Sequence, residues 1–351
     1  MLGYAASAVS YENTDTDYIH RTVYDQFKQY ASEEKYLELT ENHTYRKVMS
    51  SDPEAFSQQI PFYKIRILFT LLILGLVKIG INVFTASHLI TAAFSCSGIL
   101  VFYYAFRRYI HPYFWSVVPI FFILFGAHDV ARMVTADSLA FLWVGLICYS
   151  FLEQRWLAFF TLLILSVLVR TDMIILVTLF LFYLFVFKKN IRIASLITLL
   201  LSVGAFIFVN KYTGNYGWST VFYYALVSDM MATHPEVYST YGINITQYFT
   251  ALFSNLSLFF YDIPTLFFEA FVSLQLIILL LTKKVNQTYK SLLNLPMFIL
   301  TLISIAYVFS HYLLFPLLDS RFFVGQYFLT GLILLTAISQ LIEKNKLVPT
   351  K

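Results

Sequence analysis

The chain has 351 residues, of which 59% are hydrophobic, 19% aromatic and 13% charged. Soluble proteins average about 25% charged and about 45–50% apolar residues, and a soluble domain of this length could not bury so much apolar surface in one core. The composition therefore predicts an all-α, polytopic integral membrane protein. A net charge of +4 is too small and too dispersed to suggest a nucleic-acid partner. The two cysteines, Cys96 and Cys148, both lie in apolar runs, which excludes a disulfide framework.

The first part of the chain differs from the rest. Residues 1–65 carry 10 of the 20 acidic residues and have no long apolar run, which predicts a soluble helical segment. The run Ile67–Val77 is bounded by basic residues and has 11 residues, whereas a spanning helix needs about 20. We therefore expect an interfacial or re-entrant helix there, and we assign residues 1–82 to an external acidic loop that contains it.

Residues 83–351 are expected to form the transmembrane bundle. About nine spanning helices are predicted from charge-free or nearly charge-free runs at Ile79–Phe106, Tyr109–Ala127, Ser138–Leu152, Trp156–Val169, Met173–Phe187, Ile193–Asn210, Ile263–Thr282, Ser291–Leu318 and Phe322–Ile342. A loop at 211–262, rich in tyrosine and asparagine, separates the sixth run from the seventh, and its second half suits a helix lying in the membrane interface.

The charges of the connecting loops predict the orientation. With nine helices starting outside, the cytoplasmic loops after residue 79 carry 12 lysines and arginines, against four on the other side. Most acids fall on the outer side, where polar chemistry is expected. Leu2–Val9 looks like the outer end of a first transmembrane helix, so we expect that helix to be missing or truncated, with residues upstream of Met1. The expected location is a bacterial inner (plasma) membrane, with the active site on the outer face.

Three charged residues are expected below the outer membrane surface. The runs around them have 14 or 15 residues, and helices of that length extend about 21–23 Å in a hydrocarbon layer of about 30 Å. The connection Arg170-Thr-Asp172 and the nearby Asp137 should therefore lie deep. Charges at such depth are functional candidates by default. The alternative is an ion pair of Arg170 with Asp172 or Asp137 that closes a helix hairpin without a catalytic role.

The second candidate is an acidic pair at the membrane surface. Asp15 and Asp17 follow Leu2–Val9 and precede Tyr18 and His20. In an extended turn the two carboxylates can converge on a metal or a substrate hydroxyl, and a carboxylate near apolar surroundings can act as a general base. Asp-x-Asp is a short motif, however, and capping of the following helix by Thr16 or Asp17 is the alternative.

A third candidate begins the last apolar run, at Asp319-Ser-Arg321. The planar guanidinium of Arg321 can hold a phosphate or pyrophosphate with two hydrogen bonds. The alternative is a simple interfacial anchor. The sequence has no Gly-rich phosphate loop and no His/Cys spacing typical of a metal site.

The order of these features over residues 11–190 resembles the GT-C superfamily of membrane glycosyltransferases, such as the protein O-mannosyltransferases and the lipid A aminoarabinose transferases. Four segments carry the resemblance: Asp15-Thr-Asp17-Tyr18, Pro61-Phe-Tyr63-Lys-Ile-Arg66-Ile-Leu68, Met133-Val-Thr-Ala-Asp137-Ser-Leu-Ala140 and Val169-Arg170-Thr-Asp172. The C-terminal half matches only through Arg321, and the absence of a first helix departs from the pattern.

The resemblance implies a sugar donor on a polyprenyl phosphate or pyrophosphate, and a glycan, lipid or protein acceptor in the cell envelope. Asp17 or Asp15 would deprotonate the acceptor hydroxyl for a single displacement with inversion. Asp137 would orient substrate or, with Asp17, hold a divalent cation such as Mg²⁺ or Mn²⁺. Arg170 and Arg321 would offset charge on the phosphate leaving group. The other residues implied at the substrate are Tyr18, His20, Arg66 and Asp172.

Two other functions fit parts of the pattern. A polysaccharide polymerase of the O-antigen type also has many spans and a large external loop, which 211–262 satisfies, but it would not explain the acidic N-terminal segment. A lipid-linked sugar flippase or other transporter often shows inverted repeats. We find no internal repeat, and the charges cluster at the outer helix ends rather than midway along the helices.

Overall fold

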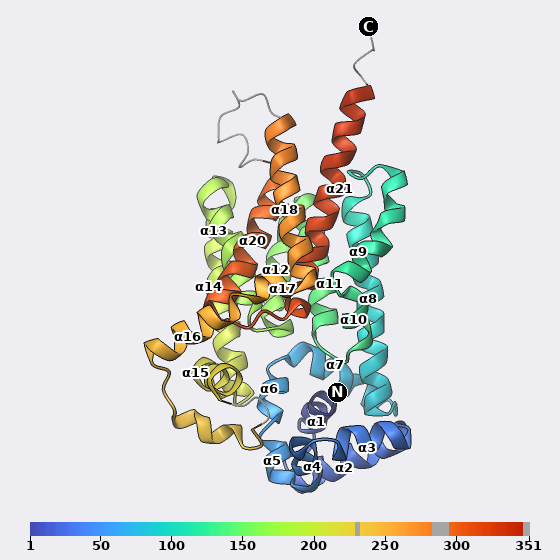
Figure 1. The fold of residues 1–351 in the computed structure, drawn as a ribbon, viewed down its shortest axis with the longest axis vertical. Helices are drawn as coiled ribbons and strands as arrows, with labels where there is room; N and C mark the ends of the chain where they lie inside the picture. Colours follow the sequence, from blue (N-terminus) through green and yellow to red (C-terminus); the bar gives the residue numbers. More distant parts are fainter. Residues whose placement is uncertain (229–231, 283–294, 347–351) are drawn as a thin grey trace.

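The computed structural model describes residues 1–228, 232–282 and 295–346, and in this part of the chain every regular element is a helix. Long helices form a bundle, and a layer of short helices closes one of its ends (Figure 1). The helical fold class predicted from the composition is confirmed for these residues.

Each of the nine predicted apolar runs contains a helix of the bundle. The bundle helices are α8 (Val83–Phe106), α9 (Val118–Leu124, preceded by the 3₁₀ turn Pro112–Val117), α11 (Asp137–Leu152), α12 (Trp156–Val169), α13 (Met173–Phe187), α14 (Arg192–Tyr212), α18 (Ile263–Thr282), α20 (Pro296–Leu314) and α21 (Val324–Lys346). The part of the run 291–318 that precedes Leu295 lies outside the described residues.

Fewer than nine of these helices meet the length and hydropathy expected of a span. Within the described residues, four do so, at Val83–Phe106, Lys189–Tyr212, Pro296–Leu314 and Ser320–Ile342. Two bent pairs raise the number to six, each pair counted as one span: Pro53–Lys64 with Ile67–Lys78, and Ile245–Tyr261 with Ile263–Leu279. The helices α9, α11, α12 and α13 are apolar but short. The structure thus supports four to six spans.

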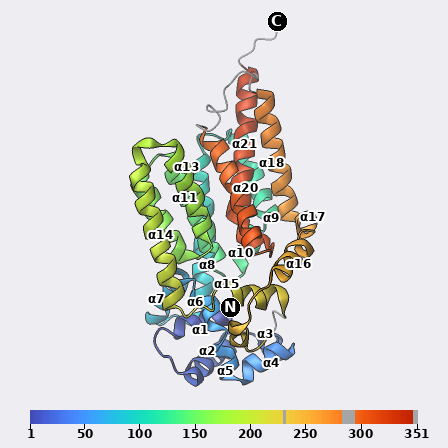
Figure 2. The same cartoon turned by 90° about the vertical axis from the view of Figure 1, so that its left-hand side faces the viewer.

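The bundle has two chemically different ends. At the end called here the basic end, Arg108 contacts Glu153, and the His111 amide donates to the Ser339 hydroxyl 2.9 Å away. At the opposite, acidic end, the starts of α11, α13 and α18 lie close to the final residues of α20 and the first residues of α21 (Figure 2). Successive helices therefore run in opposite directions, as the alternation of loops requires.

The acidic end is covered by the N-terminal segment. Its helices are α1 (Leu2–Val9), α2 (Thr16–Tyr30), α3 (Glu33–Glu41), α4 (Thr44–Ser51), α5 (Pro53–Ser57), α6 (Ile60–Lys64) and α7 (Ile67–Lys78). The helical nature predicted for residues 1–65 is therefore confirmed. The short helix α1 is almost wholly buried, packed on α2, α6, α7 and α8, because seven of its eight residues are small or apolar and Tyr4 packs on Tyr63 and Phe69.

The helix predicted not to cross, α7, has 12 residues and is bent by 113° from the preceding helical segment Pro53–Lys64. A straight helix of that length extends about 18 Å, which is less than the thickness of the hydrocarbon layer. This bend is the geometry of a broken span or of a re-entrant segment.

The predicted external loop 211–262 lies against the N-terminal layer. It contains α15 (Trp218–Phe222), the π-helical turn η3 (Tyr223–Val227), the 3₁₀ helix η4 (Pro235–Thr240), α16 (Ile245–Asn255) and α17 (Leu258–Tyr261). The Tyr216 hydroxyl donates to the Gln58 carbonyl over 3.0 Å, and the Gln59 amide to the Thr233 carbonyl over 3.3 Å. The two segments expected outside the membrane therefore form one layer at one end.

Helix α16 carries an exposed apolar stripe. Ile245, Phe249 and Phe253 recur every four residues, so they share one face, and they are 73%, 44% and 65% exposed. A capping box at Asn244 fixes the start of this helix. An apolar face of this kind on a helix next to a membrane bundle agrees with the interfacial position expected for the second half of the loop.

Candidate functional site

The acidic end contains a buried ion network around Arg170. Its guanidinium Nη1 donates to Asp137 Oδ1 at 2.5 Å, while Nε and Nη2 donate to Asp172 Oδ1 and Oδ2 at 3.0 and 2.5 Å. The Arg170–Asp172 pair is bidentate, which is the strongest geometry for this pair of groups. Arg170 is only 4% exposed and Asp137 8% exposed. The three residues that the sequence placed below the surface therefore form one cluster.

Local structure explains why these residues meet. Helix α12 ends at Val169, and Arg170 then adopts an extended conformation that turns the chain into α13. Asp172 is the N-cap residue of α13, and Asp137 is the first residue of α11. Both acids thus lie at helix N-termini, where the partial positive charge of the backbone stabilises a carboxylate.

Two side chains of α20 complete the network. The Tyr307 hydroxyl donates to Asp172 Oδ2 over 3.3 Å, and His311 Nε2 lies 3.3 Å from the same oxygen. Both side chains are buried, at 0% and 6% exposure. The Nδ1 atom of His311 has no hydrogen-bond partner among the described residues. We call Asp137, Arg170, Asp172, Tyr307 and His311 the Arg170 cluster.

Mutual pairing keeps the Arg170 cluster charged. Burial alone would lower the pKa of Arg170, but the carboxylates of Asp172 and Asp137 hold this pKa above its usual range. Burial alone would raise the pKa of Asp172, but the Arg170 charge and the His311 contact hold it well below its usual range. At neutral pH the cluster therefore contains an ionised arginine bonded to the ionised Asp172.

A second arginine lies next to the cluster, and one aromatic ring connects the two. The guanidinium carbon of Arg170 lies 4.7 Å from the centre of the Phe322 ring, and the guanidinium carbon of Arg321 lies 5.2 Å from it. Arg321 Nε lies 2.7 Å from Asp319 Oδ2, and the Arg321 side chain is 40% exposed. Its two terminal nitrogens have no hydrogen-bond partner in the part of the chain that the structure describes.

Asp319 holds Arg321 in place from one side only. The carboxylate caps the short helix Ser320–Phe323 by accepting from the Arg321 amide, and burial raises its pKa, an effect that Arg321 partly offsets. The charge of Asp137 adds a smaller upward contribution to the pKa of Asp319. Arg321 therefore has a fixed inner edge and a free outer edge, unlike the fully bonded Arg170.

Arg66 approaches this region from the N-terminal layer. It lies at the turn between α6 and α7, half-buried, and its Nη1 donates to the Phe62 carbonyl. No hydrogen bond or ion pair joins Arg66 to Arg321 among the described residues, so these two predicted substrate-binding arginines are not in direct contact.

No hydrogen bond or ion pair joins the acidic pair of the N-terminal segment to the Arg170 cluster in the described residues. Asp15 is the N-cap of α2 and accepts from the amides of Asp17 and Tyr18, at 3.0 and 3.4 Å. The capping role considered from the sequence is real, but Asp15 performs it rather than Thr16 or Asp17. The Asp17 carboxylate is exposed and has no hydrogen bond or ion pair within the described residues.

Tyr18 and His20, which were predicted next to the acidic pair, also differ from each other in exposure. Tyr18 is 40% exposed. His20 packs on Tyr24 and Phe56, and its Nε2 lies 3.1 Å from the Met49 carbonyl. These contacts hold α2 on α4 and α5.

Sequence reasoning missed Tyr307 and His311. Both lie inside the apolar run Ser291–Leu318, where attention went to loop residues. The available signal was their spacing, because residues four apart share a helix face. A tyrosine and a histidine on one face near the predicted outer end of a span point to a polar partner at that depth.

A divalent cation was predicted at Asp17 and Asp137. In residues 1–228, 232–282 and 295–346, no group of three or more His, Cys, Asp or Glu side chains is placed to hold a metal ion. Asp137 instead bonds to Arg170, and Asp17 is exposed on α2. The divalent cation at Asp17 and Asp137 therefore stays a prediction.

Comparisons of the chain with models of protein families, with curated proteins and with solved structures find no match.

Proposed function

We propose that this protein is a membrane glycosyltransferase of the GT-C type, which moves a sugar from a polyprenyl-phosphate-linked donor to an acceptor at the acidic end of the bundle. The proposal keeps all nine apolar helices in a bacterial inner membrane. It places the acidic end and its helical layer on the extracytoplasmic face. The acceptor is a glycan, a lipid or a protein of the cell envelope.

One observation carries the proposal: a half-exposed arginine with two unpartnered terminal nitrogens lies beside a buried, fully bonded ion network. Arg321 Nε lies 2.7 Å from Asp319 Oδ2 without a hydrogen bond, and the guanidinium lies over Phe322, which leaves the terminal nitrogens available to a ligand. A fixed guanidinium of this kind suits a phosphate, which it can bind through two parallel hydrogen bonds.

The reaction would be one displacement at the anomeric carbon. The acceptor oxygen forms a bond to that carbon while the bond to the carrier phosphate breaks, and the phosphate leaves with the electron pair. Arg321 would offset the negative charge that grows on the leaving phosphate, where fixed charges help most. Asp17, the carboxylate of the acidic pair that caps no helix, would accept the proton of the acceptor hydroxyl.

Arg170 takes a different role from the one implied by the resemblance. Its guanidinium is bonded on three nitrogens to two carboxylates, so it has little left to offer a phosphate. We assign it as a positioning residue that fixes Asp137, Asp172 and the face of Phe322 on which Arg321 stacks.

The test uses the full chain in lipid nanodiscs with polyprenyl-phosphate-linked sugars as donors. The expected result is release of the free carrier phosphate together with a glycosylated acceptor. Loss of one charge-stabilising group typically lowers turnover by about 10²–10³-fold, which is the effect expected for Arg321→Gln. Arg132→Gln is the matched control, because Arg132 is exposed at the same end and outside the cluster, and it should leave turnover unchanged.

Asp17→Asn tests the base, with Asp25→Asn on the same helix as its control. Full turnover in both Asp17→Asn and Asp15→Asn would show that the acidic pair supplies no base. Movement of the intact glycosylated carrier between leaflets, with no carrier phosphate released, would instead identify a flippase. Extension of a lipid-linked glycan by whole repeat units would identify a polymerase.

A further inference from the structure

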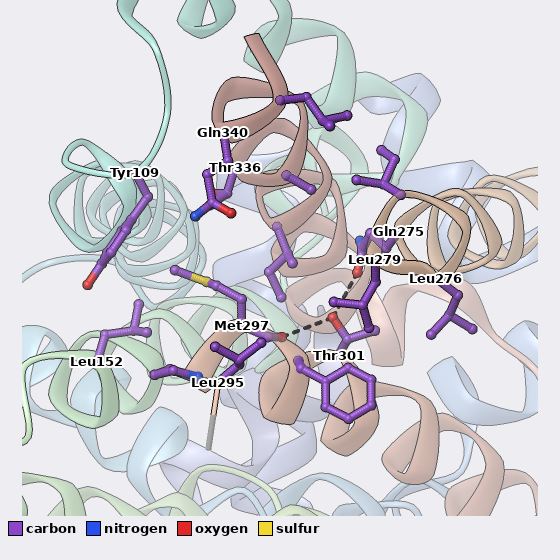
Figure 3. A pocket seen from close by; sticks show the side chains of 16 residues that line it. Tyr109, Leu152, Gln275, Leu276, Leu279, Leu295, Met297, Thr301, Thr336 and Gln340 are labelled. Carbon is purple, nitrogen blue, oxygen red and sulfur yellow. Dashed lines mark hydrogen bonds between the residues drawn. The ribbon is translucent and has the colours of Figure 1, made fainter. Parts of the chain in front are cut away.

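The basic end of the bundle contains a cavity of about 350 Å³ (Figure 3). It lies between α18, α20 and α21, with Tyr109 of the loop after α8 and Leu152 at the end of α11 on its other side. Its wall is mostly aliphatic, with Leu279, Met297 and Ile333 among its residues. Volumes of about 300–1,000 Å³ with apolar walls and a few polar groups are typical of small-molecule sites.

A hydrogen-bonded bridge lines one side of this cavity. The Thr301 hydroxyl donates to Gln275 Oε1 over 2.7 Å, and Gln275 Nε2 donates to the Thr330 carbonyl over 2.6 Å. The bridge links α18, α20 and α21, and it uses polar groups that would otherwise be costly to bury. The side chains of Gln275 and Thr301 are thus hydrogen-bonded within the protein, and most of the remaining wall is aliphatic.

A second hollow of about 520 Å³ adjoins the first, and the two share Leu152 and Pro296. Its wall contains Lys188 and Lys189, where the chain passes from α13 to α14, together with Gln154 and Asn190. Neither lysine ammonium group has an ion-pair partner among the described residues. An apolar cavity therefore continues into a cationic one.

We propose that this pair of hollows is a binding site for an anionic membrane phospholipid. One hydrocarbon chain would occupy the apolar cavity, and the phosphate of the head group would lie at Lys188 and Lys189. Basic pockets between transmembrane helices on the cytoplasmic side are known to suit such head groups. The site lies at the end opposite Arg321 and does not depend on sugar transfer.

The arrangement selects a phospholipid rather than a soluble anion. The lysines offer charge but only a partial enclosure, since Lys189 and Asn190 are exposed. The apolar cavity would remain unfilled by phosphate alone. A phospholipid can occupy both hollows at once, because its hydrocarbon chain fills the apolar cavity and its phosphate lies at the lysines.

The experiment adds phosphatidylglycerol or phosphatidylcholine of equal chain length to the full chain in detergent. Native mass spectrometry then measures how much lipid stays bound when the detergent is removed. Phosphatidylglycerol should be retained and phosphatidylcholine should not. Lys188→Gln/Lys189→Gln should weaken phosphatidylglycerol binding by about 25-fold, because each basic group near the surface contributes about fivefold. The matched control is Lys28→Gln/Lys211→Gln, which removes two exposed lysines at the acidic end.

The cavity is tested separately by Ala337→Phe, which places a ring in the apolar hollow. This variant should lower phosphatidylglycerol retention, while Leu200→Phe on the exposed face of α14 should not. Unchanged melting temperatures would establish that both variants fold. Equal retention of the two lipids would overturn the proposal, and so would wild-type retention in both test variants. Displacement of bound phosphatidylglycerol by inorganic phosphate at a concentration equal to that of the lipid would show that the site takes a soluble anion instead.

Discussion

Arg170 and Arg321 show how two arginines on one aromatic ring can differ in role. Arg170 is bonded to two carboxylates and shielded from solvent, whereas Arg321 is bonded on one edge and 40% exposed. A buried pair adds little net stability, but removing one partner leaves an uncompensated charge in an apolar environment. Chemistry at the phosphate is therefore expected at Arg321, and structural dependence at Arg170.

Replacing Arg170 by glutamine should destabilise the protein by about 3–5 kcal/mol, because Asp137 and Asp172 would stay buried without a cation. The measurement is thermal or denaturant unfolding of the full chain in one detergent. Arg132→Gln, which removes an exposed arginine at the same end, should change stability by less than about 0.5 kcal/mol. A wild-type melting curve for Arg170→Gln would mean that the network does not hold the fold together.

At the residue scale, the sequence predicted site residues correctly where charged residues are rare, within apolar segments. Asp137, Arg170 and Asp172 stood out because they interrupt apolar helices, and the structure brings them together. His311 and Tyr307 were missed because single polar residues within an apolar run look like packing residues until their partner is known. The role of Asp15 could not be predicted, because the sequence alone does not distinguish an aspartate that caps a helix from one whose carboxylate is free.

Among the described helices, α8 and α11 share the most extensive contact. A Cβ atom on Gly98 of α8 would lie 2.5 Å from Cδ1 of Phe141 and 3.3 Å from Cα of Leu142 on α11. The helices approach this closely only because Gly98 has no side chain. Small residues at such contacts are a general device of membrane helices, where packing rather than hydrophobic burial drives association.

Gly98→Ala should therefore destabilise the protein by about 1–3 kcal/mol, the usual effect of overpacking. Gly75→Ala is the control, because a Cβ at Gly75 of α7 would meet nothing within 4 Å. That change should be neutral or slightly stabilising, since alanine is the better helix former. Equal unfolding curves for the two variants would contradict the close packing of α8 on α11.

Elements were easier to predict than their lengths and bends. Every apolar run contains a helix, because a continuous apolar segment near lipid must bond its own backbone. The bend of 113° before α7 and that of 74° between α17 and α18 were beyond the sequence pattern. Contacts between residues far apart in the chain, such as those of Gln58 and Gln59 with the 211–262 loop, were likewise beyond the local pattern.

Over the whole molecule, one end differs from the other in charge and architecture. The N-terminal layer and the 211–262 loop cover the acidic end, while the connections at the basic end carry Arg107, Arg108, Arg155, Lys188 and Lys189 (Figures 1 and 2). By the positive-inside rule we propose that the basic end faces the cytoplasm.

Single-cysteine labelling checks this orientation after Cys96 and Cys148 are replaced by alanine. In intact cells stripped of their outer wall, a membrane-impermeant maleimide should label Gln29→Cys and Ser239→Cys to the same extent, since these exposed positions lie in the layer at the acidic end. Asn190→Cys should react only after the cells are permeabilised. Labelling of Asn190→Cys before permeabilisation would reverse the proposed orientation.

The shortness of α11, α12 and α13 has a mechanical consequence for the surrounding lipid. These helices have 14–16 residues and extend about 21–24 Å, so in the proposed nine-span arrangement a hydrocarbon layer of about 30 Å would have to become thinner where it meets them. Such mismatch has an elastic cost that grows with bilayer thickness. In that arrangement the thinned region would lie beside the turn that carries Arg170, so a lipid there would bring its head group toward the protein's interior. Thinner membranes would then accommodate the protein at a lower elastic cost.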